Sequence, residues 1–275
     1  MLLTDRNGAE KCIVNPDQDL LLVAKNYKLY LARKPGEEKT YFLRVPNDRS
    51  QNGQMNFEAE MLRHLAKCSE VTEARYAETT GNPDARVHYD WLFPSLEDTF
   101  LTGEDQGGRQ VNMLGVLDAE LSDFMPLPKL KEAFDIDAKT AAWIIGRLFK
   151  LQTFLEDNGG FYNFREDQVI IEPKMHRLVY LGWSDAGEVC NWDSVAKAAQ
   201  AIRPWVRKND TPDEDKFIEL LEYLSDTELK MDGITAHRTL YTDITKWWGH
   251  AYYPFTYFDK QVGSWRQMDA TITTP

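Results

Sequence analysis

The segment from Ala138 to Glu156 constrains the fold more than any other part of the sequence. Its apolar residues recur at helical spacing and form one broad stripe, made of Ala141, Ile144, Ile145, Leu148, Leu151 and Leu155. Asp135 or Asp137 can cap the start, because a carboxylate accepts hydrogen bonds from the unpaired amides of a first helical turn. Asn158-Gly159 supplies residues that readily adopt the left-handed geometry of a helix end. The sequence therefore predicts a long helix that contributes much of a core.

The part of the chain before this helix has the period of β-strands. Short apolar or alternating runs, separated by turn residues, predict strands over residues 19–24, 28–33, 40–45, 85–93, 98–101 and 110–116. One helix is predicted between Met55 and Cys68, where Met61, Leu62 and Leu65 recur at helical spacing. The N-terminal half is therefore expected to be a mostly antiparallel sheet with one helix.

The part of the chain after the long helix is expected to be mostly helical. Two short apolar strands are predicted over residues 168–171 and 178–181, linked by a turn that contains Pro173. Helices are predicted over residues 192–206, 213–224 and 236–248. Together with the N-terminal half, this order of elements predicts an α+β protein.

The charge of the chain restricts its partners. The sequence has 44 acidic and 32 basic residues, a net charge of −12, so it repels nucleic-acid phosphates and anionic lipid on average. No dense basic patch offsets this charge, and no stretch approaches the roughly 18 apolar residues of a membrane span. We therefore expect neither nucleic-acid binding nor membrane binding.

The N-terminus and the cysteines predict a cytoplasmic protein without a metal. Residues 1–8 contain no apolar run behind a basic start, so no signal peptide is expected. In the cytoplasm, Cys12, Cys68 and Cys190 should remain reduced. The five histidines show no spacing, among themselves or with the cysteines, that is typical of a metal site.

The order of elements and several residues resemble the protein kinase superfamily. Residues 29–33 and 41–45 resemble the second and third kinase strands, with Arg44 at the place of the nucleotide-binding lysine. Glu58 matches the helix C glutamate, and the long helix resembles kinase helix E. The ending, with Trp248-Gly249 and Tyr253-Pro254-Phe255, is similar to that of degenerate kinase-like domains of bacterial and phage type.

The resemblance implies a bilobal α+β fold. The expected N-lobe, residues 1–116, is an antiparallel five-stranded sheet with helix C. The expected C-lobe, residues 117–275, is mostly helical and is trimmed, because only 91 residues follow Ser184, the end of the segment at the position of the metal-binding triplet.

The positions that carry phosphoryl transfer in kinases are changed in this sequence. The resemblance places Asn163 at the catalytic aspartate, Gln168 at the metal-binding asparagine and Gly182 at the metal-binding aspartate. An amide is no carboxylate base, and a glycine offers Mg²⁺ no oxygen ligand from a side chain. The turn that should be rich in glycine, residues 23–27, has none and ends in the bulky Tyr27. We therefore expect no catalysis and weak or absent binding of ATP and Mg²⁺.

Three residues remain as candidates for a nucleotide cleft: Arg44, Glu58 and Asp185. Arg44 and Glu58 can still form the ion pair of kinases, either as a purely structural lock or with Arg44 touching a phosphate; the structural interpretation is favoured. Alternatively, Glu166, Asp167 or Asp185 replaces the missing carboxylates, and the protein is an atypical phosphotransferase. The competing interpretation is that these acids are solvated or cap a helix.

The end of the chain is dense in aromatic residues. The candidates for binding a protein partner are Trp247, Trp248, Tyr252, Tyr253, Phe255 and Tyr257. Aromatic side chains offer large apolar area at low entropic cost, which suits interfaces, but the same residues can instead pack as core. A homodimer through this segment stays open.

These observations predict a pseudokinase that serves as a protein-binding scaffold or regulatory module. Two alternatives from other classes remain: the atypical phosphotransferase, and a structural or assembly component, for example of a phage or bacterial complex, that forms an oligomer.

Overall fold

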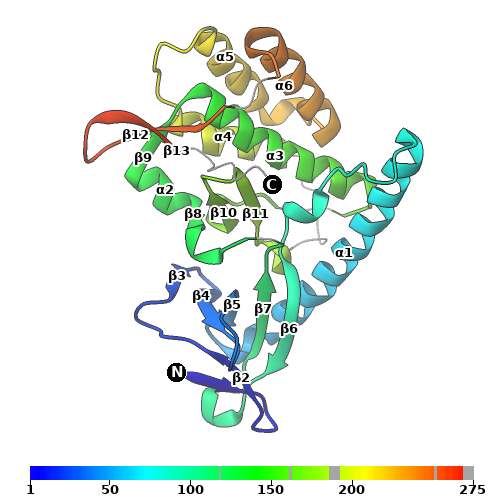
Figure 1. Ribbon diagram of the computed structural model, residues 1–275, viewed down its shortest axis with the longest axis vertical. Coiled ribbons are helices and arrows are strands. Elements are labelled where there is room, and N and C mark those ends of the chain that lie inside the picture. Colours follow the sequence, from blue (N-terminus) through cyan, green and yellow to red (C-terminus); the bar gives the residue numbers. More distant parts are fainter. Residues whose placement is uncertain (118, 161–162, 186–192, 251–252, 269–275) are drawn as a thin grey trace. The chain divides into compact units, whose positions relative to one another are not determined.

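The computed structural model describes the chain except residues 118, 161–162, 186–192, 251–252 and 269–275 (Figure 1). It divides into two compact units. The first comprises Met1–Phe124 and Val179–Asp185, and the second comprises Met125–Leu178 and Ala186–Pro275. The first holds a sheet and one long helix, and the second is mostly helical, which confirms the predicted bilobal α+β class. The expected lobe boundary at residue 116 stays a prediction.

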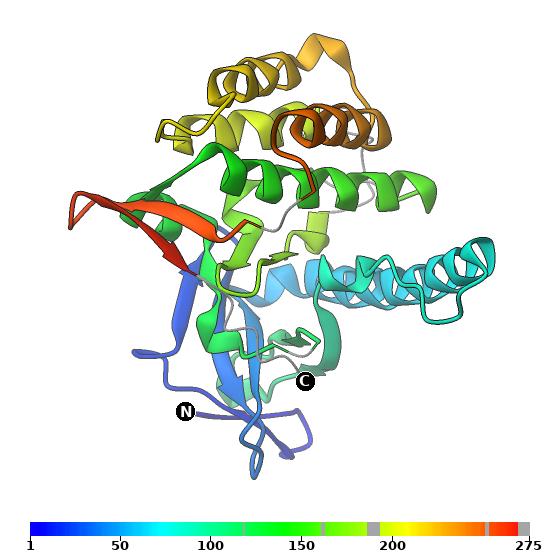
Figure 2. The same ribbon diagram turned by 45° about the horizontal axis from the view of Figure 1, so that its top comes forward.

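The described residues of the first unit form a seven-stranded sheet (Figure 1). Its strands are β1 (Leu2–Thr4), β2 (Glu10–Ile13), β3 (Leu20–Val23), β4 (Tyr27–Arg33), β5 (Thr40–Pro46), β6 (Ser95–Leu101) and β7 (Gln110–Gly115). The order is β1-β2-β4-β5-β7-β6, with β3 also paired to β4, and the pairs are antiparallel. The helix α1 (Asn52–Thr80) packs against β6 and β7, and its C-terminal half continues past the sheet (Figure 2).

The alternation along β5 places Arg44 on the face of the sheet that carries α1. Tyr41, Leu43 and Val45 point to the other face, where they join an apolar cluster with residues of β1, β2 and β7. Because successive side chains of a strand point to opposite faces, Arg44 lies toward α1. There it meets Glu58, which is buried on the inner face of α1 with Met55 and Leu62.

The structure corrects three details of the predicted N-lobe. The sheet has seven strands among the described residues where five were expected, because the polar segment before residue 14 forms the β1–β2 hairpin. The predicted strand at 85–93 is wrong: this segment contains only the short 3₁₀ helix η2 (Tyr89–Trp91). The Glu73 carboxylate accepts hydrogen bonds from the amides of Val87 (2.6 Å) and Tyr89 (3.3 Å), so a side chain replaces a strand partner. The helix predicted to end at residue 68 continues to Thr80 and stops at Gly81, where φ is 66°.

The second unit is built around the predicted long helix. Its helices are α2 (Leu127–Ala133), α3 (Ala138–Asp157), α4 (Ser194–Ile202), α5 (Glu214–Leu224) and α6 (Gly233–Trp248). Its strands are β8 (Met125–Pro126), paired with β10 (Val169–Glu172), and β9 (Phe134–Ile136), paired with β12 (Phe255–Asp259), which also pairs with β13 (Ser264–Met268). The chain passes from this unit to the first within β11 (Arg177–Tyr180). The remaining short 3₁₀ helices are Arg49–Gln51, Glu104–Gln106, Leu121–Asp123, Glu166–Gln168, Trp183–Asp185, Arg203–Trp205 and Thr227–Leu229.

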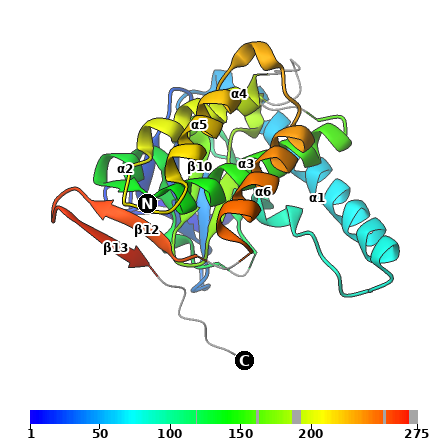
Figure 3. The ribbon, with the colours of Figure 1, turned by 90° about the horizontal axis from the view of Figure 1, so that it is seen from above.

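The start of α3 confirms one of its two predicted caps. Asp137 accepts a hydrogen bond from the Thr140 amide at 2.8 Å, whereas Asp135 pairs instead with Arg207 and Lys260. The β12–β13 ribbon, at the edge of the unit in Figure 3, was not predicted, because its residues fall within or beyond the segment interpreted as an aromatic tail. None of the described helices is both long and apolar enough to cross a membrane.

Helices α3 and α6 lie side by side and meet at Gly233 (Figure 2). A Cβ atom at Gly233 would lie 2.5 Å from the Thr153 backbone nitrogen and 2.7 Å from Gln152 Cγ. The Gly233 amide also donates to Glu156, with 2.8 Å to Oε2, so the last turn of α3 caps the first turn of α6. This contact leaves no room for any larger residue.

We predict that Gly233→Ala lowers the free energy of unfolding by about 1–3 kcal/mol, because the added methyl group overpacks backbone atoms that cannot move independently. Gly53→Ala is the matched control, since a Cβ at Gly53 has no atom within 4 Å and alanine favours a helix. Denaturant unfolding of both variants measures the difference. Equal stability of the two variants would contradict the close approach of α3 and α6.

Candidate functional site

The predicted ion pair between Arg44 on β5 and Glu58 on α1 is present, and both side chains are fully buried. Arg44 Nη1 donates to Glu58 Oε1 and also to the backbone carbonyl of Leu181. The ring of Tyr27 covers the guanidinium, with 3.6 Å between Arg44 Cζ and the ring centroid. The cation is therefore enclosed by a carboxylate, a carbonyl and an aromatic face, all within the first unit.

The other carboxylate oxygen of Glu58 is also satisfied within the first unit. Asn112, opposite Arg44 on β7, donates from Nδ2 to Glu58 Oε2 at 2.8 Å and to the Met55 carbonyl at 2.9 Å. Its Oδ1 accepts from Thr99 Oγ1 at 2.7 Å. A buried ion pair is stable only when such hydrogen bonds replace the lost hydration. Asn112 therefore contributes to the stability of the Arg44–Glu58 pair.

The turn before Tyr27 is held by backbone hydrogen bonds and by a side chain. Asn47 donates from Nδ2 to the Lys25 carbonyl at 2.9 Å, and its amide donates to the Asn26 carbonyl at 3.0 Å. Tyr27 itself is buried. The segment that corresponds to a glycine-rich loop therefore places an aromatic ring on Arg44.

At Gly182 there is no free space for a side chain. A Cβ atom at this position would lie 2.6 Å from Cζ of Tyr180, whose ring is fully buried. Trp183 is also fully buried, with its Nε1 donating to the Tyr180 carbonyl at 2.7 Å. The space of a side chain at residue 182 is thus taken by Tyr180, so an aspartate would fit there only if this packed ring moved.

Asn163 and Gln168, the other changed positions, belong to the second unit. Asn163 is exposed, and its Oδ1 accepts from Lys197 Nζ at 3.2 Å. Gln168 is buried at the end of a 3₁₀ turn, just before β10. Neither position carries a carboxylate.

The two acidic residues beside Gln168 are each paired with a cation. Glu166 Oε2 lies 2.6 Å from Lys131 Nζ, and Asp167 accepts two hydrogen bonds from the Arg165 guanidinium, at 3.0 and 2.7 Å. Among the described residues, no group of three or more His, Cys, Asp or Glu side chains could hold a metal ion. The side chain of Asp185, the remaining nucleotide-cleft candidate, lies outside the described part of the structure.

The aromatic candidates are divided between the core and the surface of the second unit. Phe255 and Tyr257 are buried in β12. Trp248 is half-buried and donates from Nε1 to the Pro212 carbonyl at 2.6 Å, and Tyr253 donates to the Trp248 carbonyl. Trp247 is half-buried, and Tyr252 lies outside the described residues. Partner binding through this set stays a prediction.

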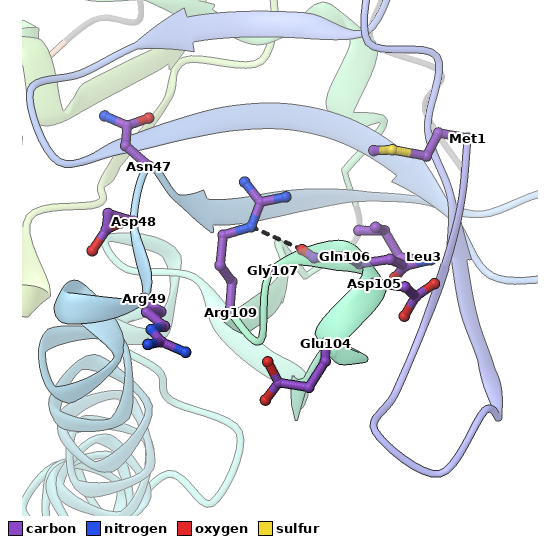
Figure 4. A pocket seen from close by; sticks show the side chains of 10 residues that line it. All are labelled: Met1, Leu3, Asn47, Asp48, Arg49, Glu104, Asp105, Gln106, Gly107 and Arg109. Atoms are coloured by element: carbon purple, nitrogen blue, oxygen red, sulfur yellow. Dashed lines mark hydrogen bonds between the residues drawn. The ribbon is translucent and has the colours of Figure 1, made fainter.

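Figure 4 shows a pocket at another part of the first unit. Its volume is about 640 Å³, and Asp48, Glu104 and Asp105 line it together with Arg49 and Arg109. Arg109 Nε donates to the Gln106 carbonyl at 3.2 Å (Figure 4). No site residue predicted from the sequence lines this pocket, and its mixed charges favour no particular ligand.

The fold is that of protein kinases. The structure resembles that of vaccinia related kinase 3 with a TM-score of 0.57 and 11% sequence identity, over 90% of each chain. It also resembles a double mutant of the PknI kinase domain of Mycobacterium tuberculosis, with a TM-score of 0.50 and 11% identity, over 84% of this chain and 94% of that one. No protein-family model and no curated protein sequence matches the chain. The likeness therefore shows a protein-kinase-like fold and nothing finer.

Sequence reasoning identified Arg44 and Glu58 but missed the groups that enclose them. Asn112 carried a signal, since it is polar within an otherwise apolar stretch of β7. The Leu181 carbonyl carried none, because its contact with Arg44 joins residues 137 positions apart in the sequence. Tyr180 carried none either, because the sequence does not show that its ring packs beside Gly182.

We predict that Glu58→Gln lowers the free energy of unfolding by about 3–5 kcal/mol, because it leaves Arg44 as a buried cation without a counter-charge. Glu60→Gln, on the exposed side of the same helix, removes the same charge and should change stability by less than about 0.5 kcal/mol. Urea unfolding of the two variants makes the comparison. If both variants changed the free energy of unfolding by less than about 0.5 kcal/mol, the Arg44–Glu58 pair would not hold α1 on the sheet.

Proposed function

We propose that this protein is a catalytically inactive pseudokinase, in which the kinase-like fold serves as a binding scaffold or regulatory module. The observation that carries the proposal is the enclosure of Arg44. Its guanidinium binds Glu58 and the Leu181 carbonyl and is covered by Tyr27, and it is fully buried. A cation in this position stabilises the protein, and it reaches a phosphate only if Tyr27 moves.

The chemistry of phosphoryl transfer supports the same proposal. That reaction depends almost entirely on positioned charges and metal ions, so each missing carboxylate removes part of the stabilisation of the transition state. Asn163 and Gln168 supply amides, and the space beside Gly182 is taken by the Tyr180 ring. We propose that ATP and Mg²⁺ bind weakly or not at all.

The atypical phosphotransferase has less support. Glu166 and Asp167 would have to leave Lys131 and Arg165 before either could bind a metal ion. Asp185 is the remaining acid of that hypothesis. An atypical enzyme would therefore depend on this residue most.

The partner is proposed to be a protein. Phe255 and Tyr257 are buried in β12, whereas Trp247 is half-buried, so we propose Trp247 as the aromatic candidate for the interface. An interface with a second copy through this segment remains part of the proposal. A mass in solution that is a fixed multiple of the mass of one chain would favour the alternative of a structural or assembly component. A mass equal to that of one chain would favour a monomeric binding module.

The test is transfer of radiolabelled phosphate from ATP, with Mg²⁺ or Mn²⁺, to the protein itself and to a general substrate protein. We expect the same incorporation as in a reaction without the protein. The matched variant is Glu166→Gln with Asp167→Asn and Asp185→Asn, which removes every spare carboxylate of the alternative. Incorporation that the wild-type protein shows and this variant lacks would overturn the proposal and establish an atypical phosphotransferase.

A further inference from the structure

The second unit contains a cavity of about 620 Å³ that none of the nucleotide-cleft candidates or changed catalytic positions lines. It lies between the first half of α3, the turn after β10, the C-terminal half of α6 and the segment that follows α6. Its volume falls within the range of about 300–1,000 Å³ that is typical of small-molecule sites. The cavity is large enough for a ligand of one or two aromatic rings.

Aromatic side chains from three segments form much of its wall: Trp143, Tyr241, Trp248 and Tyr253. Trp143 is held in place by His176, at 4.9 Å between ring centroids, and by Phe255, at 6.3 Å. His176 adopts the left-handed conformation, with φ at 50°, in the turn between β10 and β11. Flat, fixed aromatic surfaces of this kind favour a ligand with a planar ring.

The charges of the cavity are positive. Lys139 and Arg147, about two turns apart on α3, line it, and no acidic residue does so among the lining residues that the structure describes. The chain has 44 acidic and 32 basic residues. A cavity wall with two cationic and no acidic side chains therefore has a charge opposite to that of the chain as a whole. A negatively charged ligand matches this wall.

Neither cation forms an ion pair within the described part of the chain, although burial raises the pKa of the nearby Asp137 and the charge of Lys139 acts to lower it. Lys139 Nζ instead lies 4.3 Å from the ring centroid of Tyr253 and 5.9 Å from that of Trp248. Arg147 is half-buried, and burial lowers the pKa of its guanidinium. Its charge adds to burial in lowering the pKa of the neighbouring His176 to about 4, so this histidine is neutral near pH 7.

Trp143 contributes its ring to the cavity wall. Its Nε1 is buried and has no hydrogen-bond partner among the described residues, so the N–H is closed off from the cavity. The cavity therefore has two cations and an aromatic wall, and none of its described lining residues carries a carboxylate.

From these contacts we infer that the cavity binds a small planar aromatic anion, whose ring lies among Trp143, Trp248 and Tyr253 and whose carboxylate or phosphate binds Arg147 and Lys139. The site does not depend on the absence of kinase activity, because none of its residues belongs to the Arg44–Glu58 network or to the changed kinase positions. It would give the protein a ligand other than nucleotide.

The test is calorimetric titration of the full chain with two probes of this class, 2-naphthoate and phenyl phosphate, and with neutral 2-naphthamide as the matched control ligand. We expect at least one of the anions to bind at least about tenfold more tightly than the amide, which corresponds to one charge-assisted contact of about 1.4 kcal/mol. Arg147→Gln should remove this preference and Arg147→Lys should retain part of it. Trp143→Phe should weaken the binding of the anions and of the amide alike, because it removes part of the aromatic wall.

Lys208→Gln is the control protein, since Lys208 is an exposed lysine of the same unit that pairs with Asp215 outside the cavity. Its affinities should equal those of the wild type. If Arg147→Gln does not fold, Lys139→Gln and Trp143→Phe carry the comparison. Equal binding of anion and amide, wild-type affinity in the Arg147, Lys139 and Trp143 variants, or no binding of either anion up to about 5 mM would overturn the inference.

Discussion

The first unit depends on one buried ion pair, that of Arg44 and Glu58. A buried ion pair is stable only if hydrogen bonds replace its lost hydration. Here Asn112 of β7 donates to Glu58, and the Leu181 carbonyl after β11 accepts a hydrogen bond from Arg44. The pair thereby fixes α1 against the sheet and holds the Leu181 carbonyl beside them. Because a missing partner would leave a buried charge, the surrounding residues are constrained as strongly as the pair itself.

The same residues that stabilise the unit also argue against nucleotide chemistry. In a working kinase the charged side chain of this strand reaches phosphate, which requires a cation that is accessible and a loop that lets backbone amides approach the phosphates. Here Tyr27 covers the cation, and Tyr180 fills the space beside Gly182. Tyrosine at these two places adds buried apolar area, which supports the proposal that nucleotide binds weakly or not at all. The second unit shows a different arrangement, in which Lys139 and Arg147 line a cavity that has no acidic residue among its described lining residues.

Much of this fold could be predicted from the sequence, because the strongest signals are local. The stripe of α3, the Asp137 cap and the alternation of β4 and β5 depend on neighbours within a few residues, and the structure confirms them. The segment 85–93 has the alternation of a strand, yet the distant carboxylate of Glu73 binds its amides. The β12–β13 ribbon likewise depends on β9, far away in the chain. In the site, Arg44 and Glu58 followed from a resemblance, whereas Asn112, Tyr180 and the cavity beside Trp143 depend on tertiary packing that periodicity does not encode.

The central claim is that Arg44 serves the fold and not a nucleotide, and a thermal-shift titration with ATP and ADP, with and without Mg²⁺, tests it most directly. A ligand that binds only the folded state at 100 times its Kd stabilises that state by about 2.7 kcal/mol, which raises the Tm of a domain of this size by several degrees. We predict an unchanged Tm at millimolar nucleotide under all four conditions. A rise of several degrees that requires Mg²⁺ would contradict the account, because it would mean that the protein binds the metal–nucleotide complex despite the enclosure of Arg44.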